Sequence, residues 1–410
     1  MAKLGDRPGR FLERHDLEGQ RHHEAVSSTL VAVVIVLASL ESVTLRDISS
    51  VTIVFICAIS SLVLWHRVPV RFFVSWFLFL TAAVLLLGLS VAYSQSGLLR
   101  SRQIMQLVAC SLVLLGVYAL VSRLSYAHMR SIVAFVSITV VLACAIELVF
   151  RLATGSVRGS RFFGMPRPYL AFDEPAWLAT FCALFLAVSL SLRMYKVAIV
   201  LALLLLVLFT RAAFIIALAA LIMALPSVRN ARWLRLVISV GAVVLASFFF
   251  YRSMYSSPSG DSYTSVDTRI RDTWTIRQIN NNEFFPFGAS VIDLSRFETW
   301  RELPEVNNVL GFDLAWKFGI GGVVLLLLWW AVIAIILPRA AVGRSRLPSD
   351  CLPIWAALVT LPASMQFNNA FGRVWLWVLT GLMLGCMTVI TRENRGPWPD
   401  LSSRTDLLVR

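Results

Sequence analysis

The sequence predicts an all-α polytopic integral membrane protein with about 12 transmembrane helices. Two observations predict this fold class: hydrophobic residues make up 58% of the 410 residues, and charged residues make up only 15%. A soluble globular chain has roughly 45–50% apolar and about 25% charged residues. The composition therefore excludes both a soluble enzyme and an intrinsically disordered chain.

A polar segment over residues 1–24 precedes the first apolar run. It is too long and too acidic for the charged start of a signal peptide, so we expect a cytoplasmic N-terminal tail. Residues 25–251 are expected to hold transmembrane helices 1 to 9, with an outer loop over residues 154–174. The expected spans are Ala25–Leu45, Ile48–Trp65, Val70–Tyr93, Ile104–Ser122, Ser131–Ala153, Pro175–Leu192, Lys196–Thr210, Ala212–Pro226 and Trp233–Tyr251.

A long periplasmic loop is expected over residues 252–316. Apolar spacing predicts a short helix over Val266–Ile279, and a second short helix is expected to open near Asn307-Asn308 and to run into the next span. Residues 317–391 are expected to hold helices 10 to 12, and residues 392–410 a cytoplasmic tail. The last three expected spans are Lys317–Pro338, Leu352–Gln366 and Phe371–Ile390.

The seventh and eighth runs are separated only by Thr210-Arg211. As one helix they would cover about 45 Å, against about 30 Å of hydrocarbon. Two helices place Arg229, Arg232 and Arg235 on the cytoplasmic side, whereas one helix places them outside. The two-helix solution gives every cytoplasmic loop basic residues, as the positive-inside rule requires, and both termini are then cytoplasmic.

The formal net charge of +14 would suggest a nucleic-acid ligand in a soluble protein. On the predicted topology most of this charge falls on the cytoplasmic side, so it is an orientation signal and no nucleic-acid partner is expected. The six cysteines lie in or beside apolar runs without a CxxC pair, and the histidines lie in the tail and short loops. We therefore expect neither a disulfide framework nor a metal or other cofactor.

Arg211 interrupts otherwise unbroken apolar sequence. A charge there costs about 2.5–3.5 kcal/mol on insertion scales, which favours a functional role. The alternative is an interfacial arginine that extends to the membrane surface. The other outward arginines either bind phosphate in a bidentate manner or are solvated and paired with nearby acids. They are Arg158, Arg161 and Arg167 in one loop, and Arg269, Arg271 and Arg277 in the long loop.

Two further clusters contain carboxylates. Asp173-Glu174 directly precedes Pro175, a residue suited to the first turn of a helix. These acids either cap the positive helix end or supply a carboxylate that accepts a proton from a substrate hydroxyl. Glu147 and Arg151 are four residues apart, and we expect them to form a structural pair on one helix face.

The order of several motifs resembles the bacterial O-antigen polymerase and O-antigen ligase superfamily. These motifs are Arg161-Phe-Phe-Gly164, Asp173-Glu174-Pro175-Ala176-Trp-Leu-Ala179, Phe209-Thr210-Arg211-Ala212-Ala213, Arg269…Trp274, Pro286-Phe-Gly288 and Asn307-Asn308…Gly319-Ile320-Gly321-Gly322. The resemblance implies a metal-independent glycosyltransferase of the GT-C class in the bacterial inner membrane. Its donor would be an undecaprenyl-diphosphate-linked oligosaccharide on the periplasmic face. The chain departs from the family pattern at Asn307-Asn308, where ligases and many polymerases carry His-Asn.

The resemblance implies roles for particular residues. Arg211, with Arg161, Arg269 and Arg277, would bind the substrate diphosphate and stabilise the charge that develops there. Glu174, or secondarily Asp173, would take or orient the proton of the attacking hydroxyl. Positioning of the loop and of the acceptor would fall to Asn307, Asn308 and Trp274.

The Glu-Pro-small motif at Glu174 favours a polymerase of O-antigen, capsule or exopolysaccharide repeat units. The alternative within the family is a ligase that transfers glycan to lipid A core. A flippase or exporter without chemistry, and a structural envelope subunit, are alternatives of other classes. An ion-coupled transporter is disfavoured because the span centres are nearly free of ionisable groups. Besides the lipid bilayer, a chain-length regulator and export machinery are further expected partners.

Overall fold

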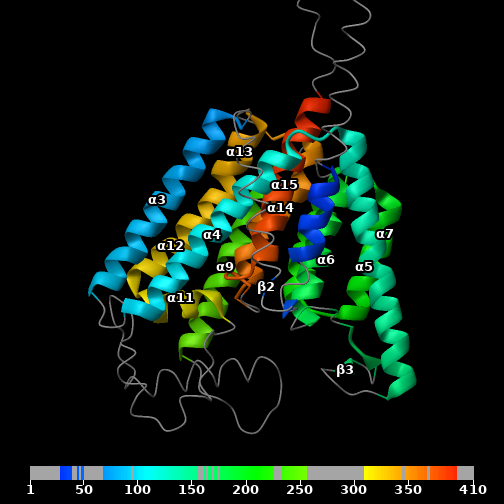
Figure 1. Cartoon of the computed structure of the whole chain (residues 1–410), viewed down its shortest axis with the longest axis horizontal. Helices are drawn as coiled ribbons and strands as arrows, with labels where there is room; N and C mark the ends of the chain where they lie inside the picture. The colour runs from blue at the N-terminus through cyan, green and yellow to red at the C-terminus, as the bar shows by residue number, and fades with distance from the viewer. Residues whose placement is uncertain are drawn as a thin grey trace, which may run out of the picture.

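The computed structural model describes residues 28–38, 44–45, 48–49, 68–93, 97–155, 161–162, 165–168, 170, 172, 175–225, 232–255, 309–343, 347–366 and 370–394. Within these ranges the regular structure is predominantly helical (Figure 1). The elements are a helix over Ser28–Ala38, β1 (Thr44–Leu45), β2 (Ile48–Ser49), α3 (Val70–Tyr93), α4 (Gly97–Val121), α5 (Tyr126–Thr154), β3 (Arg161–Phe162), β4 (Met165–Pro166), α6 (Pro175–Ser191), α7 (Tyr195–Leu208), α8 (Arg211–Ala224), α9 (Arg232–Tyr255), α11 (Leu310–Phe318), α12 (Ile320–Ala331), the π-helical turn η4 (Val332–Ile336), α13 (Leu337–Val342), the 3₁₀ turn η5 (Ser349–Cys351), α14 (Leu352–Ser364) and α15 (Val374–Glu393). The two-residue strands pair antiparallel, β1 with β2 and β3 with β4.

Five helical segments of the described residues are long and apolar enough to cross a membrane. They are Val70–Tyr93, Gln103–Val121, Tyr126–Thr154, Ile320–Val342 and Val374–Glu393. Shorter apolar helices, including α6, α7 and α8, accompany them. The helical fold predicted from the composition is thus confirmed in its coarse form, whereas the number of 12 spans remains a prediction.

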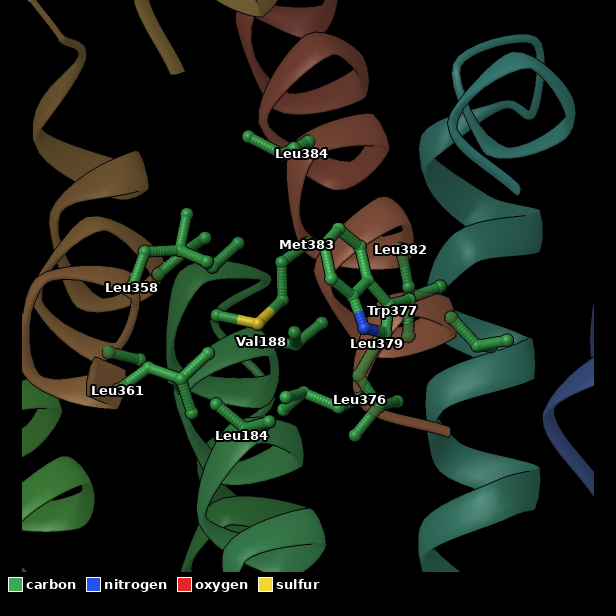
Figure 2. Packing of buried hydrophobic residues seen from close by; sticks show 14 of the residues in the cluster. Leu184, Val188, Leu358, Leu361, Leu376, Trp377, Leu379, Leu382, Met383 and Leu384 are labelled. Carbon is green, nitrogen blue, oxygen red and sulfur yellow. The ribbon is translucent and has the colours of Figure 1, made fainter. Parts of the chain in front are cut away.

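Helices α6, α14 and α15 form the centre of the bundle. Every residue of α6 from Trp177 to Ser191 is buried, and α14 and α15 are buried over almost their whole length. Figure 2 shows Leu184 and Val188 of α6 and Leu358 of α14 in the same buried cluster as Met383 of α15. Because all faces of these helices are covered, their sequences are apolar all round and lack a polar face.

The surrounding helices bury one stripe and expose large apolar side chains on the other face. On α3 the buried stripe includes Phe72, Trp76 and Phe79, while Phe77 and Leu78 are more than half exposed. Helices α5, α7 and α9 expose similar apolar faces. Soluble monomers rarely expose contiguous apolar surface on this scale. Together with the long apolar helices, this surface indicates a membrane-spanning protein.

Helices α4 and α15 pack closely through two glycines of α15. A Cβ atom at Gly381 would lie 2.6 Å from the carbonyl oxygen of Leu114, and one at Gly385 would lie 2.6 Å from Cβ of Val121. The two glycines are four residues apart and therefore lie on one face of α15. Small residues at this spacing allow membrane helices to approach closely.

The helix that begins with α12 continues past a proline. Pro338 has no N–H to bond with the carbonyl group of Ala334, and the residues before it form the π-helical turn η4. The indole Nε1 of Trp355 on α14 donates to that carbonyl oxygen at 3.0 Å. In return Trp330 Nε1 donates to the carbonyl oxygen of Val359 at 2.9 Å. These two bonds join α14 to the α12–α13 helix in the bundle interior.

The bundle has two ends, which we name after the helices that lie there. At the α11 end, the lower end in Figure 1, Leu310 N of α11 donates to the carbonyl oxygen of Met365 at the C-terminal end of α14. At the α13 end, the upper end, Asp350 accepts a hydrogen bond from Arg193, which follows α6. Arg392 near the end of α15 donates to the carbonyl oxygen of Ser122 after α4.

Several predicted boundaries were wrong. The first span was expected to reach Leu45 and the second to begin at Ile48, but these residues lie in β1 and β2. The tenth span was expected to begin at Lys317 as the continuation of a preceding helix, but Gly319, with φ 60° and ψ −135°, separates α11 from α12. Pro338 does not end the helix, because a π-helical turn and Trp355 accommodate it.

Candidate functional site at the α11 end

The seventh and eighth apolar runs form two helices, α7 and α8, as the two-helix interpretation expected. Phe209 has a left-handed backbone with φ 36°, and Thr210 is extended, so the helix stops and restarts within two residues. Arg211 is the first residue of α8 and its side chain is exposed. A cation at the positive end of a helix is unfavourable unless an anion is near.

The chain reverses direction at this break. Met223 near the end of α8 packs with Leu352 at the start of α14, and Ile354 N donates to Ser191 Oγ at the end of α6. Helices α6 and α8 therefore end together at the α13 end. Since α8 packs against both α6 and α14 along its length, Arg211 lies at the α11 end. The N-terminal end of α6, which follows the predicted Asp173-Glu174 motif, lies at this same end.

A second arginine lies at the α11 end. Arg373 immediately precedes α15, and its Cζ atom lies 4.1 Å from the centroid of the Trp177 ring in the first turn of α6. A guanidinium at this distance from an indole forms a cation–π contact. Arg373 is half-buried, whereas Trp177 is buried. The contact joins the N-terminal ends of α6 and α15.

The backbone before Arg373 is held by three helices. Gln106 Nε2 of α4 donates to the carbonyl oxygen of Gly372 at 2.6 Å, and Trp377 Nε1 of α15 donates to that of Phe371 at 2.7 Å. Ala370 N contacts Met365 Sδ after α14 at 3.3 Å. The position of the Arg373 backbone is therefore fixed by the helix bundle and not by a surface loop alone.

A cluster of aromatic rings joins the first turn of α15 to α6. Trp375 lies edge-on to Phe172 at 5.8 Å between ring centroids, and Phe172 also contacts Phe181 at 5.5 Å. Phe181 is one helical turn after Trp177 on the same face of α6. Within the described residues, the indole N–H groups of Trp177 and Trp375 are both buried without a hydrogen-bond acceptor. Aromatic packing thus connects the N-terminal parts of α6 and α15.

Glu147 and Arg151 form the predicted pair on α5, with 2.7 Å between Arg151 Nη2 and Glu147 Oε1, and this prediction is confirmed. The structure adds a contact that the spacing did not predict: Leu170 N donates to Glu147 Oε2 at 2.7 Å. This bond fixes the segment before α6 to the end of α5. In the same segment, burial lowers the pKa of the Arg167 guanidinium.

The α11 end carries more positive than negative side chains among the described residues. The acids there, Glu147 and Asp313, lie in ion pairs with Arg151 and Lys317, the latter at 2.9 Å. Gln366 accepts a hydrogen bond from Gly311 N and holds α11 against α14. The same end also carries further cations, namely Arg167, Arg211, Arg252 and Arg373. This arrangement suits an anionic ligand, and within the described ranges no three metal-ligating side chains lie together.

Most of the predicted site residues lie outside the described residues. These are Asp173, Glu174, Arg269, Trp274, Arg277, Asn307 and Asn308. Arg161 belongs to β3, of which the structure describes the backbone. Of the predicted catalytic residues Asp173, Glu174 and Arg211, the structure describes the side chain of Arg211. Its roles, and those of the other predicted residues, remain predictions.

Sequence reasoning missed Arg373. It lies inside the apolar run predicted as the last span, and the argument applied to Arg211, that a charge in such a run needs a reason, applies equally to it. No protein-family model and no curated protein matches the chain. The resemblance to O-antigen polymerases and ligases therefore stays a prediction from motifs.

Proposed function

We propose that the protein is a polymerase of undecaprenyl-diphosphate-linked oligosaccharide repeat units, acting at the periplasmic face of the bacterial inner membrane. The observation that carries this proposal is Arg211: an exposed cation that opens α8 at a break between two apolar helices. A diphosphate at the membrane surface is an anion that suits both the arginine and the positive helix end. The motifs that flank Arg211 in the sequence support the same substrate class.

The proposed reaction moves a glycan from one lipid carrier to another. A hydroxyl oxygen of the acceptor unit attacks the anomeric carbon of the donor, and the bond from that carbon to the diphosphate oxygen breaks. The electron pair leaves with the diphosphate, which stays on the donor lipid. The hydroxyl proton passes to a carboxylate, for which Glu174 is proposed. Fixed cations stabilise the charge that grows on the leaving diphosphate, so no metal is required.

Arg211 is the residue through which we test the reaction. Purified full-length protein is incubated with a lipid-linked repeat unit, and glycan length on the lipid is followed by gel electrophoresis. We expect Arg211→Ala to lower the rate of chain lengthening by about 10²-fold or more, because it removes a donor that stabilises the transition state. Arg211→Lys is also expected to fail, because an ammonium group does not reproduce a bidentate guanidinium.

The matched control is Arg339→Ala, which removes an exposed arginine of α13 at the opposite end of the bundle. We expect it to lengthen glycans at the wild-type rate. Glu174→Gln keeps the size of the side chain and removes its basicity, and we expect it to be inactive. Wild-type chain lengths from both Arg211→Ala and Glu174→Gln would overturn the mechanism.

The acceptor in the same assay separates the alternative functions. Transfer of the glycan to added lipid A core, with no lengthening on the carrier lipid, would identify a ligase. Movement of the lipid-linked unit across a proteoliposome membrane without new glycosidic bonds would identify a flippase. Either result would replace the polymerase proposal.

A further inference from the structure

Helices α5 and α7 begin beside each other at the α13 end of the bundle (Figure 1). The hydroxyl group of Tyr126, the first residue of α5, donates to the carbonyl oxygen of Leu192 at 2.9 Å. Leu192 lies in the turn between α6 and α7, and the next residue, Arg193, has a left-handed backbone with φ 57°. The hydrogen bond therefore fixes the start of α5 against this turn.

Three cations lie in these two segments. The Cζ atom of Arg130 lies 6.0 Å from the centroid of the Tyr126 ring. Arg193, like Arg130, lies close enough to Tyr126 to interact electrostatically with its hydroxyl group. Lys196 is in the first turn of α7, three residues after Arg193. All three residues are exposed, so a ligand reaches them from the surface without entering a cavity.

Few acids balance the cations at this end of the bundle. Within the described residues the acids there are Asp350 and Glu393. Asp350 pairs with Arg193 at 2.9 Å, and its side chain is 7% exposed whereas that of Arg193 is 57% exposed. This pair holds the arginine in place and leaves much of its side chain open to a second anion. The described cations at the α13 end are Arg71, Arg123, Arg130, Arg193, Lys196, Arg235, Arg339 and Arg392.

The helix ends add to this positive field. Both α5 and α7 start at the α13 end, and neither has an acidic residue in its first turn. The N-terminal end of a helix carries a partial positive charge, which favours an anion. The field of the two helix ends thus has the same sign as the three exposed cations beside them.

An apolar surface continues along both helices from the cations. On α7, Lys196, Ile199 and Leu203 are spaced at i, i+3 and i+7, so they share one face of the helix. On α5, the second and third turns expose Phe135 and Ile138. All four of these apolar side chains are more than half exposed. A long basic side chain at the end of such a face keeps its stem on apolar surface and its charge in the polar layer.

We propose that the α13 ends of α5 and α7 form a binding site for an anionic phospholipid. Its phosphate group lies against Arg130, Arg193 and Lys196, and its acyl chains lie along the exposed apolar faces of the two helices. The cations select an anionic headgroup, because basic residues at a membrane surface attract anionic lipids. The apolar faces select a lipid over free phosphate, which has no chains to cover them. The site lies at the opposite end of the bundle from Arg211 and does not rest on the proposed function.

Lipid binding to the purified protein tests this proposal. The full-length protein is delipidated in detergent and titrated with dioleoylphosphatidylglycerol, and bound lipid is measured by native mass spectrometry. Dioleoylphosphatidylcholine, which has the same chains and no net charge, is titrated in parallel and is expected to bind at least about tenfold more weakly. We expect Arg130→Gln and Lys196→Gln each to weaken phosphatidylglycerol binding about fivefold, and the double variant about thirtyfold. Arg193 is kept, because its removal would take this partner from the buried Asp350 carboxylate.

Arg339→Gln is the matched control. It removes one exposed cation from the same end of the bundle, but on α13, which packs against α3 and α15. We expect it to change the affinity for phosphatidylglycerol by less than about twofold, because its charge lies outside the proposed site. An equal loss of affinity from Arg339→Gln and Lys196→Gln would show that binding follows the overall charge, and it would overturn the site.

A competitor identifies the part of the lipid that is recognised. Glycerol 1-phosphate carries the phosphate without acyl chains, and we expect it to displace little phosphatidylglycerol. Displacement as strong as that by unlabelled phosphatidylglycerol would indicate a site for free phosphate. Equal affinity for phosphatidylcholine and phosphatidylglycerol would indicate apolar contact alone. Either result would contradict the proposal.

Discussion

Glu147 shows which contacts of a single residue can be predicted from helical spacing and which cannot. Its pairing with Arg151 follows from the interval of four residues and was predicted. Its second bond, to Leu170 N, depends on how the chain returns after α5, and no local rule predicts that path. The contact of Arg373 with Trp177 was missed for the same reason, because the two residues are far apart in the sequence.

The Glu147 contacts lead to a stability prediction. Glu147→Ala removes the ion pair with Arg151 and the acceptor of Leu170 N, so we expect it to lower the free energy of unfolding by about 1.5–3 kcal/mol. Thermal unfolding in detergent, followed by circular dichroism, measures the effect. Thr154→Ala, which removes an exposed hydroxyl at the end of the same helix, is the control and is expected to change little. Equal midpoints for the two variants would contradict the assigned contacts.

At the scale of helices, hydropathy and helix-breaking residues predict where a helix lies better than they predict where it ends. Hydropathy predicts the apolar runs that form α3 to α9, whereas the predicted helix end at Pro338 is wrong. That proline is tolerated because Trp355, on another helix, bonds the carbonyl group that it leaves open. The close contact of α4 with α15 through Gly381 and Gly385 also depends on tertiary packing, which a single sequence does not reveal.

The close packing of α4 against α15 leads to a second prediction about stability. Gly381→Ala places a methyl group 2.6 Å from the carbonyl oxygen of Leu114, so we expect the helices to separate and the thermal midpoint to fall. Gly88→Ala on α3 is the control, because a Cβ atom there meets nothing within 4 Å. It is expected to raise stability by up to about 1 kcal/mol through helix propensity. A rise in midpoint for both variants would contradict the close approach of α4 and α15.

At the scale of the whole molecule, sequence composition predicted a helical membrane protein, and the long apolar helices with exposed apolar faces agree with it. The direction of insertion is a separate prediction, made from the distribution of basic residues. Because the chain reverses direction between α7 and α8, residues on either side of these helices can be assigned to one end of the bundle or the other. Lys196 lies at the α13 end and Arg252 at the α11 end, and both side chains are exposed.

Cysteine labelling measures this orientation. In intact cells treated with a membrane-impermeant maleimide, we expect Arg252→Cys to react and Lys196→Cys to react only after the cells are broken. The described native cysteines are buried, so they are expected to add little background, which the unmodified protein measures. Labelling of Lys196→Cys alone in intact cells would invert the topology and would place the α11 end, with Arg211 and Arg373, in the cytoplasm.

The lengths of α7 and α8 have a consequence for the lipid around them. Each has 14 residues and is therefore about 21 Å long, against about 30 Å of hydrocarbon in an ordinary bilayer. Such a mismatch is relieved when the bilayer thins locally around the short helices. The break that carries Arg211 would then lie in a depression of the membrane surface. A lipid headgroup that enters this depression reaches the arginine while its polyprenyl chain stays among the surrounding acyl chains.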